Sequence, residues 1–429
     1  MKIYRYPEKE DWERIIKRPE FDQSSLFESV EKILQSVKTE GDLAVKRFTQ
    51  QFDKVVRDEI YVTESEKEMA ISSLPEEIRS SIELAAKNIR RFHQVQLVAP
   101  QVIETMPGII CWRKSVAIEK VGFYIPGGTA PLFSTILMLG IPASIAGCKE
   151  IILCTPPGRD GKIHPAILYT AGICGIKNVF AVGGVQAIGA MAYGTATIPK
   201  VDKIFGPGNQ YVTAAKQLIQ QKGVAIDMPA GPSEVCVLAD EEASPAFIAA
   251  DLISQAEHGA DSQVLLVSTS DDLVTLTIAE LEKQLSAIPR REFAAKALQY
   301  SNAVVTRNIS DALDIVNAYA PEHLIIMSKN DEELAEKIIS AGSVFLGSFS
   351  PESVGDYASG TNHTLPTNGY AKAYSGVSVD SFVKKITYQK LTREGLHAIG
   401  PAVITMAECE GLTGHAEAVR VRLATIGEK

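Results

Sequence analysis

Short, almost wholly apolar segments alternate with segments of helical character from about residue 118 onward. The first group is "KVGFYI", "EIILCT", "NVFAVGG" and "VDKIFGPG", and a second group follows with "SEVCVLAD", "QVLLVST", "AVVT", "HLIIMS" and "SVFLG". Strands that are apolar along their whole length must be covered on both faces, which is typical of parallel sheets flanked by helices. The alternation therefore predicts an α/β chain with two lobes, each built around a parallel sheet.

The length of 429 residues exceeds what one ordinary hydrophobic core accommodates, which agrees with two lobes and appended segments. Residues 1–24 are expected to form an N-terminal extension. The segment 25–117, helical at first, is expected to join residues 234–377 in the first lobe, whereas residues 118–233 form the second. Apolar residues at helical spacing predict a small, all-helical appendage over residues 378–429.

The composition is that of an ordinary globular protein, with 45% hydrophobic and 22% charged residues and a net charge of −9. This charge, without any dense Lys/Arg block, argues against nucleic acid or an anionic membrane as the main partner. The charged start "MKIYRYPEKEDWERIIKRPE" lacks the apolar core of a signal peptide, and no apolar run is long enough for a membrane span. The six cysteines are scattered without a C-x-x-C pair, so we expect reduced thiols and a cytoplasmic location.

Glycine-rich turns follow several predicted strands of the second lobe, in "YIPGGTAP", "AVGGVQA" and "FGPGN". Glycine lets the backbone approach a ligand closely, and a helix N-terminus behind the turn favours a phosphate group. Nucleotides bind such folds in the crevice at the carboxyl ends of the strands. None of the turns matches the fingerprint G-x-G-x-x-G, and each alone is equally explained as a tight strand-to-helix turn. Together they favour a nucleotide site.

A polar cluster closes the predicted helix in "DLISQAEHGADSQ". The spacing of Gln255 and His258 places both side chains on one helix face, where an amide oxygen and an imidazole nitrogen could bind one metal ion. Taken alone, the same residues are better explained as a polar helix terminus closed by Gly259.

Further polar clusters each pair a carboxylate with a histidine, and each also has a plain structural interpretation as a strand edge, a surface loop or an exposed helix start. Imidazole, carboxylate and amide groups together suit Zn²⁺, although the spacing is not that of a compact zinc motif. The pairs are Glu322 and His323 in "APEHLIIM", Asp356 and His363 in "SPESVGDYASGTNHTLPT", and Glu410 and His415 in "ECEGLTGHAEAV".

Long stretches of the chain resemble the L-histidinol dehydrogenase family. The matching segments are "VGFYIPGGTAPLFSTILMLGIPASIAGCKE", "KIFGPGNQYVTAAK", "AIDMPAGPSEV", "DLISQAEHGADSQV", "PEHLII" and "AGSVFLGSFSPESVGDYASGTNHTLPT". The resemblance covers nearly the whole chain and is weakest at its start. It implies Rossmann-like lobes that are incomplete and doubly wound. It also implies a zinc-dependent enzyme that oxidises L-histidinol to L-histidine through L-histidinaldehyde with two NAD⁺, in the last steps of histidine biosynthesis.

The resemblance also assigns roles to individual residues. One zinc ion per subunit is implied for Gln255, His258, Asp356 and His415. Glu322 and His323 match the catalytic acid–base pair. Substrate contacts carry over to Ser233, Gln255, His258, His323, Asp356, His363, Glu410 and His415. Contacts to NAD carry over to Tyr124, Gln186 and Asn209. In the family the C-terminal appendage crosses to the neighbouring subunit, which implies a homodimer with shared active sites.

The implied chemistry suits these residue types. Oxidation of an alcohol requires a base for the hydroxyl proton, and His323 is suited because imidazole titrates near neutrality. Oxidation of the aldehyde requires added water, since the hydrate can release hydride, and Glu322 is suited to activating that water. The alternative, a cysteine thiohemiacetal, is disfavoured because Cys148 and Cys154 flank a predicted strand and are expected in the core. Zinc is expected mainly to position the substrate's imidazole and amino nitrogens.

Two other functions remain open at this point. One is a related zinc- and NAD-dependent dehydrogenase for another small polar alcohol, against which His363, Glu410 and His415 argue because they fit a substrate with an imidazole and an amine. The other is a zinc hydrolase or a non-catalytic metal-binding protein. The glycine-rich turns speak against that second possibility.

Overall fold

The structure is a computed structural model that describes residues 1–19, 24–127, 131–229 and 231–427. The described chain divides into two compact units. The first comprises Met1–Gln96 and Ile118–Ser381, and the second comprises Leu97–Ala117 and Phe382–Lys429. Each unit is therefore assembled from two separate stretches of sequence.

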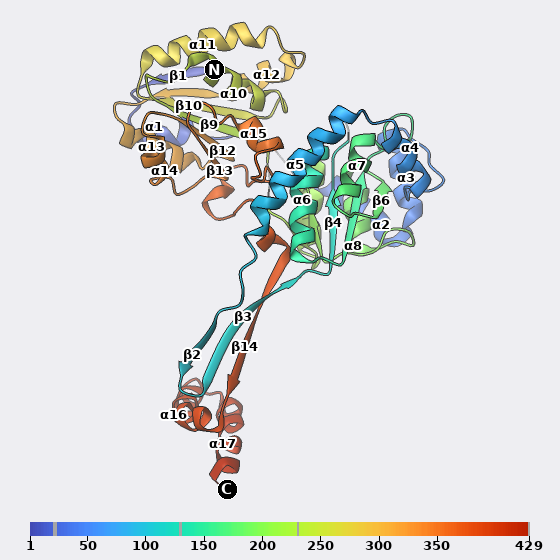
Figure 1. Cartoon of the computed structure of the whole chain (residues 1–429), viewed down its shortest axis with the longest axis vertical. Coiled ribbons are helices and arrows are strands. Elements are labelled where there is room, and N and C mark those ends of the chain that lie inside the picture. Colours follow the sequence, from blue (N-terminus) through green and yellow to red (C-terminus); the bar gives the residue numbers. More distant parts are fainter. Residues whose placement is uncertain (20–23, 128–130, 230, 428–429) are drawn as a thin grey trace. The chain divides into compact units, whose positions relative to one another are not determined.

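One half of the first unit is a parallel sheet (Figure 1). Within the described residues its six strands are β1 (Lys2–Arg5), β9 (Glu234–Ala239), β10 (Gln263–Ser268), β11 (Asn302–Val305), β12 (His323–Met327) and β13 (Ser343–Leu346). They are ordered β1–β11–β10–β9–β12–β13, and all neighbours run parallel.

Helices cover both faces of this six-stranded sheet. One face carries α10 (Pro245–Ala256), α11 (Asp271–Leu285) and α12 (Arg291–Ala297). The other face carries α1 (Lys9–Ile15), α13 (Ile309–Tyr319) and α14 (Asp331–Ala335). Along β9, Val235 and Val237 pack toward the first set of helices, whereas Cys236 and Leu238 pack toward the second. The prediction of a parallel sheet buried on both faces is confirmed.

A second parallel sheet forms the other half of the unit. In the part of the chain that the structure describes, its five strands are β4 (Lys120–Tyr124), β5 (Glu150–Thr155), β6 (Asn178–Ala181), β7 (Lys203–Phe205) and β8 (Ala225–Ile226), in the order β6–β5–β4–β7–β8. The helices that connect these strands are α6 (Phe133–Ala146), α7 (Pro165–Ile173), α8 (Gly184–Tyr193) and α9 (Gln210–Gln220). This half corresponds to the predicted lobe of residues 118–233.

The helices before this sheet pack differently from expectation. They are α2 (Ser24–Glu40), α3 (Asp42–Asp53), α4 (Glu64–Ser72) and α5 (Glu76–Gln94). Helix α2 contacts α8 and α9, and α5 contacts α6 and α7, so residues 25–96 pack mainly on the five-stranded sheet and do not form part of the six-stranded lobe. Helix α5 also touches that lobe, where Asn88 donates to the backbone oxygen of Ala358. The apolar face of α2, which includes Val30 and Leu34, joins the core of the five-stranded sheet. Amphipathic patterning predicts which face of a helix is buried but not which sheet it meets.

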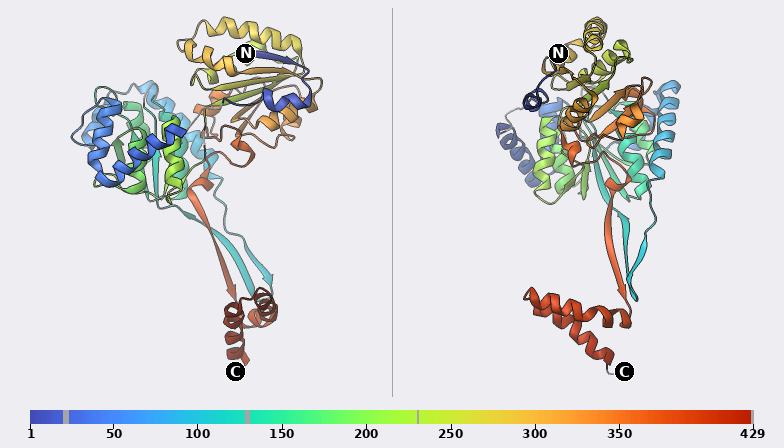
Figure 2. Two further views of the ribbon diagram at one scale, coloured as in Figure 1. Left: turned by 180° about the vertical axis from the view of Figure 1, so that it is seen from behind. Right: turned by 90° about the vertical axis from the view of Figure 1, so that its left-hand side faces the viewer.

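The second unit contains strands as well as helices. Here β2 (Val102–Met106), β3 (Ile109–Ala117) and β14 (Val383–Leu391) form an antiparallel sheet in the order β14–β3–β2, and Figure 2 shows these strands side by side. Helices α16 (Arg393–Cys409) and α17 (Thr413–Gly427) pack on each other. The appendage is thus not all-helical as predicted, because β14 pairs with residues 109–117 from a distant part of the sequence.

Two smaller features bear on the site. The polar loop at 350–367 contains a short helix, α15 (Glu352–Tyr357), and 3₁₀ turns lie at Leu298–Tyr300 and Tyr370–Lys372.

Among the described residues, no helix is both long enough and apolar enough to cross a membrane.

Candidate active site

Two cavities lie among the described residues of the first unit. The larger, of about 960 Å³, is lined near the carboxyl ends of β4, β6 and β7 by Tyr124, Gly184 and Asn209. The smaller, of about 370 Å³, lies at the amino end of β12 and is lined by Glu322 and His323. Asn209 lines both, so the cavities adjoin. The larger cavity lies at the carboxyl ends of the strands, the usual ligand position of a parallel α/β sheet. The smaller cavity lies at the amino ends of strands in the six-stranded sheet.

Glu322 and His323 are both held by one peptide of the neighbouring strand β9. An Oε2 atom of Glu322 accepts a hydrogen bond from the backbone N–H of Glu234 over 2.9 Å. His323 Nδ1 lies 3.2 Å from the backbone carbonyl oxygen of the same Glu234. Because a carbonyl oxygen only accepts, Nδ1 carries a proton, and Nε2 is the atom that can exchange one.

Several carboxyl groups surround this imidazole. His323 Nε2 lies 3.2 Å from Oδ1 of Asp356. Burial opposes a charge on the ring, but Glu322, Glu352 and Asp356 outweigh it and raise the pKa of His323 to about 10. Burial also raises the pKa of both Glu322 and Glu352 to about 8, against the opposing effect of His323. Without a bound cation, Glu322 and Glu352 are therefore largely protonated at neutral pH. A cation in the cavity would favour their ionised forms, so the three carboxyl groups suit a cation site.

Three of the predicted zinc ligands line the smaller cavity: Gln255, His258 and Asp356. Gln255 lies in the last turn of α10, His258 follows directly, and Asp356 belongs to α15. His258 Nδ1 lies 2.9 Å from the backbone oxygen of Ser254, which orients the ring and leaves Nε2 for a metal. An amide oxygen, an imidazole nitrogen and a carboxylate together fit Zn²⁺.

The fourth predicted ligand, His415, lies in α17 of the second unit, and Glu410 follows α16 in the same unit. Across the described ranges, no three His, Cys, Asp or Glu side chains are grouped so as to hold a metal ion. Gln255 is not of these residue types and His415 belongs to the other unit, so the four-ligand set stays a prediction.

Two predicted substrate contacts, Ser233 and His363, line the same smaller cavity. His363 is fixed at both nitrogens: Nδ1 lies 2.7 Å from the backbone oxygen of Asp356, and Nε2 lies 3.0 Å from Oγ1 of Thr135. Burial lowers the pKa of His363, so its ring is neutral at neutral pH. Thr135 belongs to α6, and this contact therefore joins the two halves of the unit at the cavity.

The predicted NAD contacts Tyr124, Gln186 and Asn209 all line the larger cavity. The Tyr124 hydroxyl accepts a hydrogen bond from the backbone N–H of Gly184, and the Asn209 side chain caps α9. Gln186 is fully buried, yet neither atom of its amide has a hydrogen-bond partner within the described chain. An unpartnered buried amide is costly, so this arrangement points to a ligand that supplies the missing partners.

Several residues around the cavities escaped the sequence prediction. Glu234 and Glu352 stand inside the matched segments, and a carboxylate that opens the otherwise apolar strand "SEVCVLAD" was the available signal for Glu234. Asp53, at the end of α3, lines the larger cavity, and its Oδ2 is buried without a partner in the described structure. Burial raises the pKa of Asp53 to about 6. Nothing in its local sequence marks it as a cavity residue.

None of the six cysteines lines either cavity in the described part of the chain. Cys154 is buried, as expected, and Cys148 is half-buried. Burial raises the pKa of Cys148 to about 11 and that of Cys154 still further. These thiols are therefore protonated and unreactive at neutral pH.

Parallel sheets, a large cavity rimmed by glycine-rich turns and a buried Glu–His pair beside it define the class of this protein as an α/β enzyme with adjoining cofactor-type and acid–base sites. Comparison with known proteins makes the assignment specific. The family model for histidinol dehydrogenase matches residues 16–423. The chain belongs to the histidinol dehydrogenase family, and the predicted resemblance is confirmed.

The similarity spans whole chains. A histidinol dehydrogenase of Bacteroides thetaiotaomicron is 57% identical over 426 residues, which cover 99% of this chain and 100% of that relative. A chloroplastic histidinol dehydrogenase of Arabidopsis thaliana is 52% identical over 100% of this chain and 93% of its own length. The crystal structure of histidinol dehydrogenase from Elizabethkingia anophelis superposes with a TM-score of 0.98 at 54% identity, covering 100% of this chain and 99% of that one.

Proposed function

We propose that this chain oxidises L-histidinol to L-histidine through L-histidinaldehyde, with two NAD⁺ and one zinc ion per subunit. One observation carries the proposal: the buried pair Glu322 and His323 shares a cavity with the donors Gln255, His258 and Asp356. That cavity adjoins the larger one, which has the size and position of a nucleotide site. Membership of the family supports the choice of substrate and of both cofactors.

His323 is the base for the hydroxyl proton. Without a cation its pKa of about 10 keeps the ring protonated, and that of Glu322, about 8, keeps most of the carboxyl protonated. A cation in the cavity would lower both pKa values and free both groups to accept a proton. His323 acts through Nε2, because Nδ1 is committed to the backbone carbonyl of Glu234. Glu322 activates the water that adds to the aldehyde, and its Oε2 is fixed by the N–H of the same peptide. A positioned acid or base of this kind contributes about 10²–10⁴-fold to a rate.

Gln255, His258 and Asp356, together with His415, hold the zinc ion. When bound, zinc supplies a positive charge that offsets the buried carboxyl groups and anchors the substrate's imidazole and amino nitrogens. Gln255 belongs to α10 and Asp356 to α15, and His258 directly follows α10, so helices of the first unit position these three donors. His363, neutral and fixed at both nitrogens, contributes to the wall that receives the substrate.

Tyr124, Gln186 and Asn209 would hold NAD in the larger cavity. His258 and Asn209 line both cavities, so a cofactor bound there would lie next to the cavity that receives the substrate. The unpartnered amide of Gln186 supplies one donor and one acceptor for polar groups of the cofactor.

The active form is a homodimer in which Glu410 and His415 complete the site of the neighbouring copy. Both residues belong to the second unit, which is small and carries an antiparallel sheet with two helices. A unit of this size buries little apolar surface by itself, which favours docking on another chain. Because all six cysteines are free thiols, we place the enzyme in the cytoplasm.

The acid–base roles are tested with His323→Asn and Glu322→Gln. Both variants should bind zinc normally and lose about 10²–10⁴-fold in turnover, with Glu322→Gln affecting oxidation of supplied aldehyde at least as strongly as that of histidinol. His164→Asn is the matched control, since His164 caps α7 through its side chain and asparagine can do the same. Turnover within about twofold of the control in either variant would contradict a general-base role.

A further inference from the structure

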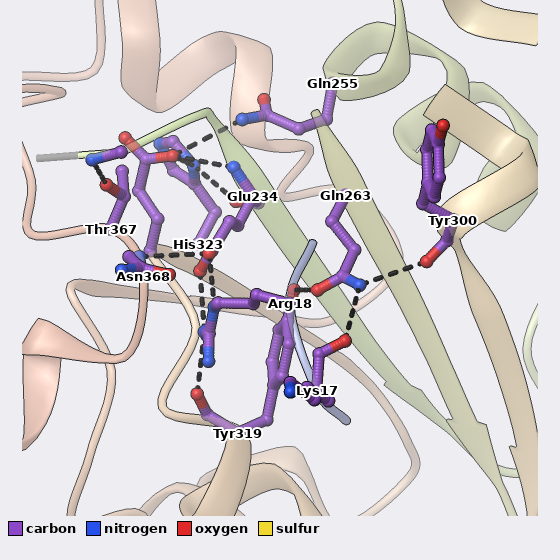
Figure 3. Close-up of polar contacts among 12 residues, drawn as sticks. Lys17, Arg18, Glu234, Gln255, Gln263, Tyr300, Tyr319, His323, Thr367 and Asn368 are labelled. Carbon is purple, nitrogen blue, oxygen red and sulfur yellow. Dashed lines mark hydrogen bonds and ion pairs between the residues drawn. The ribbon is translucent and has the colours of Figure 1, made fainter. Parts of the chain in front are cut away.

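We infer that Arg18 is a positioning residue for the acid–base pair and that it acts through Glu234. The inference rests on the proposed roles of Glu322 and His323. Figure 3 shows the Arg18 side chain against the Glu234 carboxylate, with His323 close by. The backbone of Glu234 in turn contacts the side chains of Glu322 and His323.

The ion pair between Arg18 and Glu234 is bidentate and shielded from water. Arg18 Nε donates to Oε1 of Glu234 over 2.5 Å, and one terminal nitrogen donates to Oε2 over 2.8 Å. The two side chains are only 16% and 3% exposed. The backbone N–H of Asn368 donates to the same Oε1 over 2.9 Å. A planar fork with two parallel hydrogen bonds fixes both the position and the plane of a carboxylate, which a single point charge cannot do.

Arg18 is itself fixed by a chain of contacts behind the pair (Figure 3). Its guanidinium lies 4.1 Å from the ring centroid of Tyr319 and donates to the backbone oxygen of that residue over 2.8 Å. The Tyr319 hydroxyl donates to the side chain of Gln263 over 3.0 Å. The Gln263 amide donates to the backbone oxygens of Lys17 and Tyr300. The side chain of Arg18 thus has little freedom to follow a moving carboxylate.

The peptide of Glu234 links the fixed side chain of Arg18 to the acid–base pair. Its N–H positions the Glu322 carboxylate and its carbonyl fixes the tautomer of His323, so one displacement of this peptide disturbs both groups. A buried ion pair adds little stability compared with packed apolar side chains, so we assign this pair a role in geometry. Misplacement of a reacting group by about 1 Å can cost about a hundredfold in rate.

The test compares Arg18→Met with Arg57→Met in the zinc-loaded, full-length enzyme. Arg57 forms another shielded ion pair, with Glu66, and its side chain is 14% exposed, but it lines neither cavity. Both variants should lower the melting temperature and leave the zinc content unchanged. Only Arg18→Met should lower kcat, by about ten- to a hundredfold, with KM for histidinol within about threefold of wild type. Arg18→Lys should recover part of the loss, because it restores the charge but not the fork.

A mutant cycle separates positioning from general damage. If Arg18 acts through the acid–base pair, adding Arg18→Met to the variant that carries both Glu322→Gln and His323→Asn should slow that variant no further. Losses in kcat that multiply, or a kcat for Arg18→Met within about twofold of Arg57→Met, would overturn the inference. Should Arg18→Met fail to fold, Arg18→Lys and Glu234→Gln carry the same comparison, since both preserve side-chain volume. A wild-type enzyme that forms no NADH with histidinol would instead contradict the proposed function.

Discussion

Replacing Gly206 with alanine should both destabilise the fold and weaken cofactor binding. Gly206 has φ +123°, and a Cβ atom there would lie 1.9 Å from the backbone oxygen of Tyr124. Tyr124 ends β4, the central strand of its sheet, so the backbone cannot easily give way by the required distance of about 1 Å. A non-glycine residue in this backbone region costs about 1–3 kcal/mol, and overpacking against a rigid neighbour adds about 1–3 kcal/mol.

The expected loss of affinity for NAD follows from the side chain that this turn positions. The N–H of Gly206 donates to Asp227 over 2.8 Å, and its carbonyl accepts from Lys216 over 2.9 Å, so a buried ion pair holds the turn in place. Asn209, three residues on, caps α9 and lines both cavities. A displaced turn moves this side chain away from the cofactor, and the affinity for NAD should fall with the stability.

Urea denaturation and calorimetric titration with NAD measure the two effects, against two glycine controls. Gly147 has φ +88° with open space around a Cβ, so Gly147→Ala tests backbone strain alone, at a cost of about 1 kcal/mol. Gly172 lies within α7, also in open space, and Gly172→Ala should be neutral or stabilising by up to about 1 kcal/mol. A loss in Gly206→Ala no larger than in Gly147→Ala would refute the steric reasoning.

Three further predictions concern other parts of the molecule. Chains with His258→Ala and chains with His415→Ala should each be inactive alone. Random mixing in equal amounts should restore about a quarter of wild-type activity, because in each mixed dimer one site has both defects and the other site has neither. Mixed dimers without recovery would show that His415 acts within its own chain. Thr63 caps α4 in a reciprocal pair of bonds with Glu66, so Thr63→Ala should lower the free energy of unfolding by about 1 kcal/mol in urea, while Thr63→Ser stays within a few tenths. Burial raises the pKa of Asp53 to about 6, so the folded state binds this proton more tightly than the unfolded state does. Stability from this group is therefore lost as pH rises from about 4 to about 6. Without NAD, the melting temperature of Asp53→Asn should exceed that of wild type at pH 7 and match it near pH 4; an equal difference at both pH values would contradict this.

The sequence predicted the helices and strands better than it predicted which of them pack or pair with one another. Continuous apolar runs such as "EVCVLA" identified nine of the eleven strands described in the two parallel sheets, because strands buried on both faces consist almost entirely of apolar residues. The short edge strands β1 and β8 were missed, and β1 places the predicted N-terminal extension in the six-stranded sheet. The apolar face of α2 was visible, but the choice of α8 and α9 as its neighbours depends on long-range shape complementarity that local periodicity does not encode. The same holds for β14, whose partner β3 lies far back in the sequence.

The residues of the candidate site were likewise predicted only in part. Gln255 and His258 were marked by their spacing at the end of a predicted helix, and His363 by its place in a long polar loop; all three line one cavity. Arg18 could not be found in this way, because its partner Glu234 is separated from it by more than two hundred residues and an arginine near a chain start is unremarkable. Contacts made by side chains that are distant in sequence appear only once the fold is known.

The stoichiometry of the reaction tests the central claim most directly. Purified, zinc-loaded enzyme is supplied with a limiting amount of L-histidinol and excess NAD⁺; NADH is counted by absorbance and the product is identified by chromatography. Two NADH should form for each histidinol consumed, with L-histidine as the sole product, and chelation of the metal should abolish both until zinc is returned. One NADH per histidinol with released aldehyde, or unchanged turnover after complete removal of zinc, would contradict a two-step oxidation at a zinc-held site.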